Sequence, residues 1–335
     1  MGTSLTATGV QFPDNSVQVA PAMTGFRNKI INGKMEFDQR NAGALVTYQT
    51  TGFPTGATNG YFIDRFQMRN LRTNGALLYG QQVIDAPATS GVTYCTSITN
   101  QTGGVTAATD VIFFRQIIEG SNVSDLQWGT AYAKPVTLSF WVKSSILGTF
   151  AVSIRNNPIT VAYVSTYTID VINTWEYKTI TIPGPTTGAW DSSNGLGVTI
   201  SWDLGFGSNF VTSTANVWTT GDVHTIAGLT KFSNTTSANI RFTGVQFERG
   251  SIATEFEHRP YQIELASCQR YYQTFIVVVE ANVNFSTFTY PVTMRVAPTI
   301  SGGGAGFTIN FGTQGAYNAY QTTRNGQTLT FTAEL

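Results

Sequence analysis

Residues 136–143 read VTLSFWVK, and this stretch decides the fold class. One face carries Val136, Leu138, Phe140 and Val142, and the other carries Thr137, Ser139, Trp141 and Lys143. A period of two with one apolar face is typical of an antiparallel strand that packs on one side only. The same alternation recurs at 150–155 and 198–204. We therefore predict an antiparallel β-protein.

Further strand patterns occupy 78–84, 92–98, 111–118, 175–182 and 239–248. In the last of them the apolar phase slips at Gly244, which predicts a β-bulge. Many short strands with no helical stretch between them favour two packed sheets. Residues 28–260 are therefore expected to form a jelly-roll β-sandwich.

Residues 1–27 form a separate segment, which we call the arm. Residues 5–19 read strand, turn, strand, and Pro13, Asp14 and Asn15 provide the turn chemistry. Two such strands are not stable alone, so the arm requires a partner. A neighbouring copy of the chain is the simplest partner, and this predicts a trimerisation or attachment element.

Residues 261–335 are expected to form a small helix-plus-β unit, which we call the tip. The one helix pattern covers 260–273, because Tyr261, Leu265, Cys268 and Tyr272 share a helical face. Pro260 suits the first helical position. Strand patterns follow at 274–281, 286–296, 306–311 and 328–333, with a glycine-rich turn at 301–306. The expected fold is all-β: an N-terminal β arm, a jelly-roll β-sandwich and a C-terminal helix-plus-β tip.

Composition excludes several classes of function. Of the 335 residues, 11% are charged and the net charge is zero, whereas an ordinary domain has about 25% charged residues. A nucleic-acid partner would require a basic stripe, which this sequence lacks. The longest apolar run, 275–279, is strand-sized, so no membrane insertion is expected, and residues 1–11 show no signal-peptide pattern. The two cysteines, Cys95 and Cys268, are expected to be buried thiols.

Several segments carry a family resemblance. They are RNKIINGKMEFDQR at 27–40, YFIDRF at 61–66, FTGVQFERGSIATEFEHRPY at 242–261, ELASCQRYY at 264–272, FTYPVTMRVAPT at 288–299, and TGVQFPDNSVQ at 8–18. The first three resemble parts of the sandwich domain of bacteriophage tail-fibre proteins. The next two resemble the tip segment that follows it, and residues 8–18 resemble short elements of the fibre shaft. The resemblance implies a carbohydrate-binding-module-like jelly roll, a homotrimer, and a place on the virion after assembly in the host cytoplasm. The implied partners are other tail or baseplate proteins and a host-surface glycan.

Tryptophans are the candidate glycan-binding residues. A flat aromatic ring fits the apolar face of a sugar. Trp128, Trp190 and Trp218 stand in loop-like contexts, whereas Trp202 shares its phase with core residues. The alternative for the three loop tryptophans is packing within a large sandwich.

A structural calcium ion is the one cofactor to consider. Calcium prefers carboxylate and carbonyl oxygens. Asn32, Glu36 and Glu248 could meet where the first and last segments of the sandwich pair. No spacing motif supports such a site, and ordinary surface polarity is the alternative.

No catalytic site is expected. A glycosidase requires two carboxylates across a sugar bond. Asp191, Asp203 and Asp222 are the candidates, and Asp191 lies in an ordinary turn sequence. A Ser-His-Asp site would require His224 or His258, and no Gly-x-Ser-x-Gly motif occurs.

These observations predict a trimeric, non-enzymatic tail fibre or fibre tip that attaches to a host glycan. Two alternatives remain open. One is a tail adaptor, or a capsid or neck appendage, with no receptor contact. The other is a polysaccharide-degrading tailspike.

Four arginines recur in the resembling segments: Arg27, Arg65, Arg249 and Arg259. They are expected to pair with acids such as Asp64 or Glu257.

Overall fold

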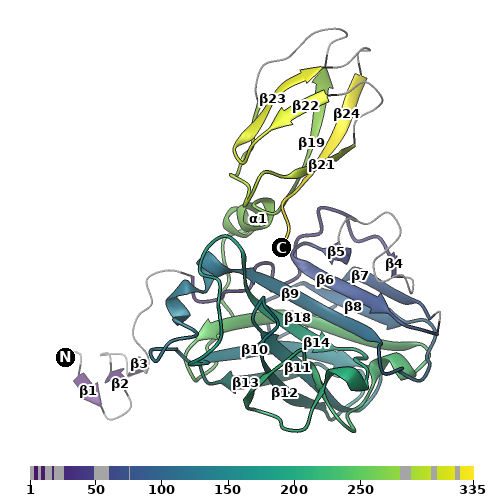
Figure 1. Cartoon of the computed structure of the whole chain (residues 1–335), viewed down its shortest axis with the longest axis vertical. Helices are drawn as coiled ribbons and strands as arrows, with labels where there is room; N and C mark the ends of the chain where they lie inside the picture. Colours follow the sequence, from purple (N-terminus) through teal and green to yellow (C-terminus); the bar gives the residue numbers. More distant parts are fainter. Residues whose placement is uncertain are drawn as a thin grey trace.

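The computed structural model describes residues 26–48, 60–74, 76–279, 288–302, 308–320 and 325–335, and the short strands 4–6, 9–11 and 17–18. Within these ranges the regular structure is nearly all β, with a single α-helix. The chain is an all-β protein built on a jelly-roll sandwich, as the alternation predicts (Figure 1).

Two antiparallel sheets form the sandwich. The six-stranded sheet has the order β13-β10-β18-β8-β7-β4, with β4 (Val46–Tyr48), β7 (Leu78–Ile84), β8 (Tyr94–Asn100), β10 (Val136–Ser144), β13 (Glu176–Ile182) and β18 (Ala238–Arg249). The seven-stranded sheet has the order β16-β12-β11-β14-β9-β6-β5, with β5 (Tyr61–Ile63), β6 (Phe66–Leu71), β9 (Val111–Glu119), β11 (Gly148–Arg155), β12 (Val161–Ile169), β14 (Leu196–Asp203) and β16 (Trp218–Thr220). All strand patterns predicted in the sandwich correspond to strands here, whereas β4, β5, β6, β12 and β16 were not predicted.

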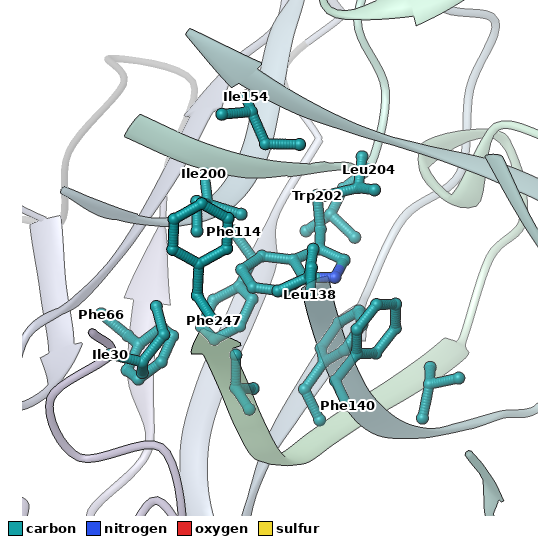
Figure 2. Packing of buried hydrophobic residues seen from close by; sticks show 14 of the residues in the cluster. Ile30, Phe66, Phe114, Leu138, Phe140, Ile154, Ile200, Trp202, Leu204 and Phe247 are labelled. Atoms are coloured by element: carbon teal, nitrogen blue, oxygen red, sulfur yellow. The ribbon is translucent and has the colours of Figure 1, made fainter. Parts of the chain in front are cut away.

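The apolar faces of the two sheets meet in one core (Figure 2). Trp202 of β14 is its largest fully buried side chain. Its ring centroid lies 5.5 Å from those of Phe140 and Phe114, which come from opposite sheets. Aromatic pairs at this spacing add to the stability that burial provides. Shorter elements complete the sandwich: the parallel pair β15 (Val211–Thr212) and β17 (Thr225–Ile226), and the 3-10 helices η2 (Gly120–Asn122), η3 (Ser124–Leu126), η4 (Ser208–Phe210) and η5 (Phe232–Asn234).

The predicted bulge in β18 is confirmed. Ser139 pairs with Gln246, but Trp141 pairs with Thr243, so the register between β10 and β18 shifts between these pairs. Gly244 lies in the shift with a φ of 57°, a left-handed conformation that favours glycine. The bulge explains why the apolar residues of β18 change phase here.

Helix α1 (Tyr261–Gln269) and two three-stranded sheets form the C-terminal part. One sheet has the order β19-β24-β21 and the other β20-β23-β22, with β19 (Tyr272–Val279), β20 (Phe288–Thr289), β21 (Thr299–Gly302), β22 (Thr308–Phe311), β23 (Gly315–Tyr320) and β24 (Asn325–Thr332). No helix in the part of the chain that the structure describes is both long and apolar enough to cross a bilayer.

The predicted helix over 260–273 is too long, and Pro260 precedes the first helical residue as its cap. Tyr271 is fully buried, and its hydroxyl donates to Glu119 of β9 at 2.7 Å. This contact and the start of β19 at Tyr272 end the helical face early. The strand predicted at 286–296 is also too long, because β20 covers only Phe288–Thr289.

The arm contains three short strands, β1 (Ser4–Thr6), β2 (Gly9–Gln11) and β3 (Val17–Gln18), in one antiparallel sheet. The predicted turn at Pro13–Asn15 lies outside the described residues, as does most of the glycine-rich turn at 301–306. The division of the chain at residues 27 and 260 stays a prediction. Both cysteines are free and buried, as predicted.

Buried charges join the C-terminal part to the sandwich. Figure 1 shows the C-terminus between the two. Glu334 accepts hydrogen bonds from Arg65 and, at 2.8 Å, from Arg40. Arg40 also pairs with Asp64 at 3.3 Å, and the side chains of all four are at most 5% exposed.

The expected partners of the recurring arginines are confirmed only in part. Arg27 and Arg259 pair with Glu257 at 4.0 and 3.1 Å, as expected. Arg65 instead pairs with Glu334, near the end of the chain. Arg249 is exposed at the end of β18.

Replacing Arg65 with methionine should strongly destabilise the junction. Removal of one partner from a buried ion pair leaves an uncompensated charge and costs about 3–5 kcal/mol. Lys34→Met is the matched control, because the Lys34–Glu36 pair is partly exposed and such pairs contribute about 1 kcal/mol or less. Thermal and urea unfolding of both variants measures the difference. Equal stability of the two variants would contradict a structural role for the Arg65–Glu334 pair.

Candidate functional site

The three predicted tryptophans converge at one end of the sandwich. Trp128 follows η3, Trp190 lies in the loop after β13, and Trp218 begins β16. The ring centroid of Trp128 lies 4.8 Å from that of Trp190 and 5.5 Å from that of Trp218. Trp190 and Trp218 are 5.6 Å apart, and all three pairs meet edge to face. Three segments far apart in the sequence therefore share one aromatic cluster.

Each indole is fixed by a hydrogen bond from its ring N–H. Trp128 donates to the carbonyl of Lys134 at 2.8 Å, Trp190 to that of Thr187 at 3.1 Å, and Trp218 to that of Pro183 at 2.7 Å. Trp128 is only 7% exposed and belongs to the core, so it is not an open loop residue. Trp190 and Trp218 are partly buried against that core. The cluster closes the end of the sandwich and holds its loops in place.

A pocket of about 350 Å³ opens beside this cluster, and we call it the tryptophan pocket. Its lining combines apolar side chains with polar ones: Val123, Trp128, Tyr132, Trp190 and Val198, then Ser124, Gln127, Thr130, Asp191 and Ser192. Trp218 does not line it, although its ring contacts those of the other two tryptophans. Tyr132 is 72% exposed and forms an open aromatic edge.

The lining suits a ring-shaped, hydroxyl-rich ligand. Apolar surface from Trp128 and Trp190 lies next to carboxylate, amide and hydroxyl groups. Pockets that bind small molecules combine mostly apolar walls with a few fixed polar groups. Asp191 accepts hydrogen bonds from the N–H and hydroxyl of Ser193, both at 2.6 Å, and these lower its pKa. Asp191 can thus act as a charged hydrogen-bond acceptor at neutral pH.

The sequence prediction missed Tyr132 and Gln127 as lining residues. Both belong to the loop that carries Trp128, and Tyr132 comes only four residues after it. An aromatic residue so close to a candidate tryptophan was the available signal. Burial of Trp128 and exposure of Tyr132 depend on the tertiary structure, so the sequence alone could not separate them.

A Ser-His-Asp chain of hydrogen bonds also exists, but its serine and histidine are buried. His224 Nδ1 lies 2.9 Å from Ser153 Oγ, and Nε2 lies 3.0 Å from Asp222 Oδ1. Ser153 is fully buried and His224 stacks on Phe206 at 4.1 Å. A nucleophile must reach its substrate, and this serine is enclosed in the sheet. The arrangement ties residues 222–231, which we call the covering loop, to β11 of the seven-stranded sheet.

The other two carboxylate candidates do not join Asp191 in the pocket. Asp203 accepts hydrogen bonds from Lys231 at 2.8 Å and from Thr225, and it is almost fully buried. Asp222 pairs with Arg155 at 2.7 Å as well as with His224. Both carboxylates hold the covering loop.

The predicted calcium ligands are engaged by different protein partners. Asn32 donates to the carbonyls of Phe37 and Asp64 at 2.8 and 3.0 Å. Glu36 pairs with Lys34 at 2.7 Å. Glu248 accepts hydrogen bonds from the N–H and hydroxyl of Thr254 at 2.8 and 2.6 Å. Among the described residues, no three histidine, cysteine, aspartate or glutamate side chains are grouped to hold a metal, and calcium binding at these positions stays a prediction.

No protein-family model and no curated protein sequence matches the chain. Among solved structures, it is similar to the enzymatically active domain of tailspike protein 4 from bacteriophage CBA120, with 15% identity, a TM-score of 0.36, and coverage of 67% of this chain and 21% of that one. It is also similar to a putative sugar-binding protein from Bacteroides thetaiotaomicron VPI-5482, with 12% identity, a TM-score of 0.37, and coverage of 67% and 100%. A CBM4 structure gives 17% identity, a TM-score of 0.30, and coverage of 65% and 98%. The chain thus spans about a fifth of the tailspike domain, and similarity at this level implies no function for it.

His224 should make the protein less stable in acid. Burial lowers its pKa from 6.5 to about 4. Above pH 6.5 His224 is neutral in both the folded and the unfolded chain, so there it has no effect on how the free energy of unfolding varies with pH. As the pH falls from 6.5 to 4, the unfolded chain binds a proton that the folded chain excludes, and stability falls by about 3 kcal/mol.

His224→Gln should therefore flatten the stability curve between pH 6.5 and 4, as measured by urea unfolding at each pH. His258→Gln provides the control, because His258 is exposed. A His224→Gln curve parallel to that of the wild type would contradict this assignment.

Proposed function

We propose that this chain is a non-enzymatic attachment protein of a bacteriophage tail that binds a host-surface glycan. The observation that carries the proposal is the tryptophan pocket, where aromatic surface and polar groups from separate loops line one cavity. The resemblance of the sequence to tail-fibre proteins supports a place on the virion, with other tail or baseplate proteins as partners.

Recognition at this pocket requires no bond to be broken. The apolar face of a sugar ring packs on Trp190 and Tyr132, while its hydroxyls bond to Asp191 and Gln127. The aromatic cluster behind the pocket is held by its own hydrogen bonds, so little ordering is required on binding. Pre-organisation of this kind favours affinity because it reduces the entropy lost by the protein.

Trimer formation would convert a weak site into firm attachment. A single site of millimolar affinity supplies only about 4 kcal/mol. Three sites on one fibre act together, since the second and third contacts form at high effective concentration. The charge-poor sequence fits an assembly, because the cores of protein interfaces are depleted of charged residues.

The pocket also supports binding rather than hydrolysis. Hydrolysis of a glycosidic bond uses two carboxylates, one of them an acid with a raised pKa. Asp191 is the one carboxylate among the described residues that line the pocket, and its pKa is lowered. This favours the attachment protein over the polysaccharide-degrading tailspike.

Tyr132→Ala should weaken glycan binding about five- to tenfold, because it removes stacking of about 1 kcal/mol or more. Tyr132 is highly exposed, so the fold should be unaffected. Val105→Ala, at an exposed residue outside the pocket, is the control. Calorimetric titration with neutral hexasaccharides of glucose, mannose, xylose and N-acetylglucosamine measures the change. Unchanged affinity in Tyr132→Ala would exclude the pocket as the site, and a wild-type protein that binds none of the probes would favour a tail adaptor or a capsid or neck appendage.

Light scattering of the full chain should give three times the mass of one chain. A variant that lacks residues 1–27 tests whether the arm holds the trimer, and a monomeric truncated form is the expected result. If the truncated form remains trimeric, the contacts lie in the sandwich or tip. A full-length monomer would contradict the fibre.

A further inference from the structure

A second aromatic surface lies on the outer face of the six-stranded sheet. Trp141 of β10 and Tyr177 of β13 are directly opposite each other, and their ring centroids are 5.2 Å apart. Their neighbours Phe140 and Val142 point into the core, so these two rings point away from it. Tyr177 is 42% exposed and Trp141 is only partly buried. The sandwich core does not require an aromatic pair at this place.

The bulge at Gly244 positions Trp141. A side-chain carbon at Gly244 would lie 3.0 Å from Cδ1 of Trp141, so the indole rests against the bulged backbone. β-Bulges commonly re-aim side chains next to functional sites. Here the bulge sets the orientation of one half of the aromatic pair.

One wall beside the aromatic pair, residues 253–258, is fixed by two buried side chains of β18. Gln246 accepts a hydrogen bond from the N–H of Glu257 at 2.8 Å and donates to the carbonyl of Glu255 at 3.3 Å. Glu248 holds the N–H and hydroxyl of Thr254. Gln246 and Glu248 are at most 2% exposed. Buried polar groups that are fully satisfied make a segment rigid.

The second wall is a tight turn at residues 87–91. The N–H of Ser90 donates to the carbonyl of Pro87 at 3.0 Å, and its hydroxyl donates to the same carbonyl at 2.6 Å. Gly91 approaches His258, because a side-chain carbon there would lie 3.0 Å from Nε2. The two walls and the aromatic floor enclose a groove of about 540 Å³. We call it the sheet-face groove.

We propose that the sheet-face groove is a second saccharide-binding site, separate from the tryptophan pocket. A sugar ring stacks on Trp141 and Tyr177, and its hydroxyls bond to Glu255 and His258 at the rim. Among the described residues that line the groove, Glu255 is the one carboxylate, and no lysine or arginine lines it. A uronic acid would meet this carboxylate without a cation to balance it, so the ligand class is a neutral hexose chain.

The nearby cations do not change this assignment. Lys143 and Arg241 lie further along the same face and share Asp85 as their partner. Asp85 also accepts a hydrogen bond from the indole N–H of Trp175 at 3.4 Å. These four residues form a polar cluster outside the groove. Trp175 therefore provides an aromatic residue near the groove that does not line it.

The test is calorimetric titration of the full chain with neutral hexasaccharides of glucose, mannose, galactose and N-acetylglucosamine, and with hexagalacturonate. For at least one neutral probe, Trp141→Ala should weaken binding at least tenfold and Tyr177→Ala about fivefold. Trp175→Ala is the matched control and should bind as the wild type does. Hexagalacturonate should bind at least tenfold more weakly than that probe.

Tyr132→Ala separates the two sites, because it should leave binding at the sheet-face groove unchanged. If every bound probe is lost in Tyr132→Ala but retained in Trp141→Ala and Tyr177→Ala, the groove is overturned and the tryptophan pocket stands. If no neutral probe binds the wild type, or hexagalacturonate binds best, the groove is likewise overturned. Since Tyr177 is exposed, its variant keeps the test valid even if Trp141→Ala fails to fold.

Discussion

The pairing of β10 with β18 is the contact on which most of the sandwich depends. Its inner side brings Phe140 and Phe242 against Trp202 of the opposite sheet. Its outer side carries Trp141, which lines the sheet-face groove, and Gln246 and Glu248, which fix one of its walls. One register therefore sets both the core and a surface feature. The bulge at Gly244 allows one strand to serve both the core and the outer surface. It changes which residues of β18 face outward without breaking the strand.

Several of the few charged side chains of this chain are buried. Arg40, Asp64, Arg65 and Glu334 form a network at the junction of sandwich and tip, and each side chain is nearly inaccessible. Buried ion pairs add little net stability compared with apolar residues of the same size, but a missing partner is costly. Such a network therefore favours one docking geometry over its alternatives. The covering loop (residues 222–231) is held in a similar way, because its Lys231 pairs with the buried Asp203 of β14.

Much of the sandwich could be predicted, because its strands alternate between an apolar face toward the core and a polar face toward solvent. Alternation at 136–143 located β10, and the slip of phase at Gly244 located the bulge. The end of α1 could not be predicted, because it depends on the contact of Tyr271 with Glu119, a residue 152 positions away. The partner of Arg65 was missed for the same reason: Glu334 is 269 positions distant. Local patterns carry no information on such pairs.

The tryptophans show what a local pattern can and cannot reveal about a binding surface. Trp128, Trp190 and Trp218 were selected by their loop contexts, yet their edges meet one another and their N–H groups bond to nearby carbonyls. Packing therefore uses much of their surface, and exposed Tyr132 supplies the open edge. Loop context does not select Trp141, because this residue occupies a polar position of an alternating strand. That position is the stronger signal, since a large apolar ring on the wet face of a strand loses hydrophobic stabilisation unless something covers it. A saccharide in the sheet-face groove, as proposed, would provide that cover for Trp141.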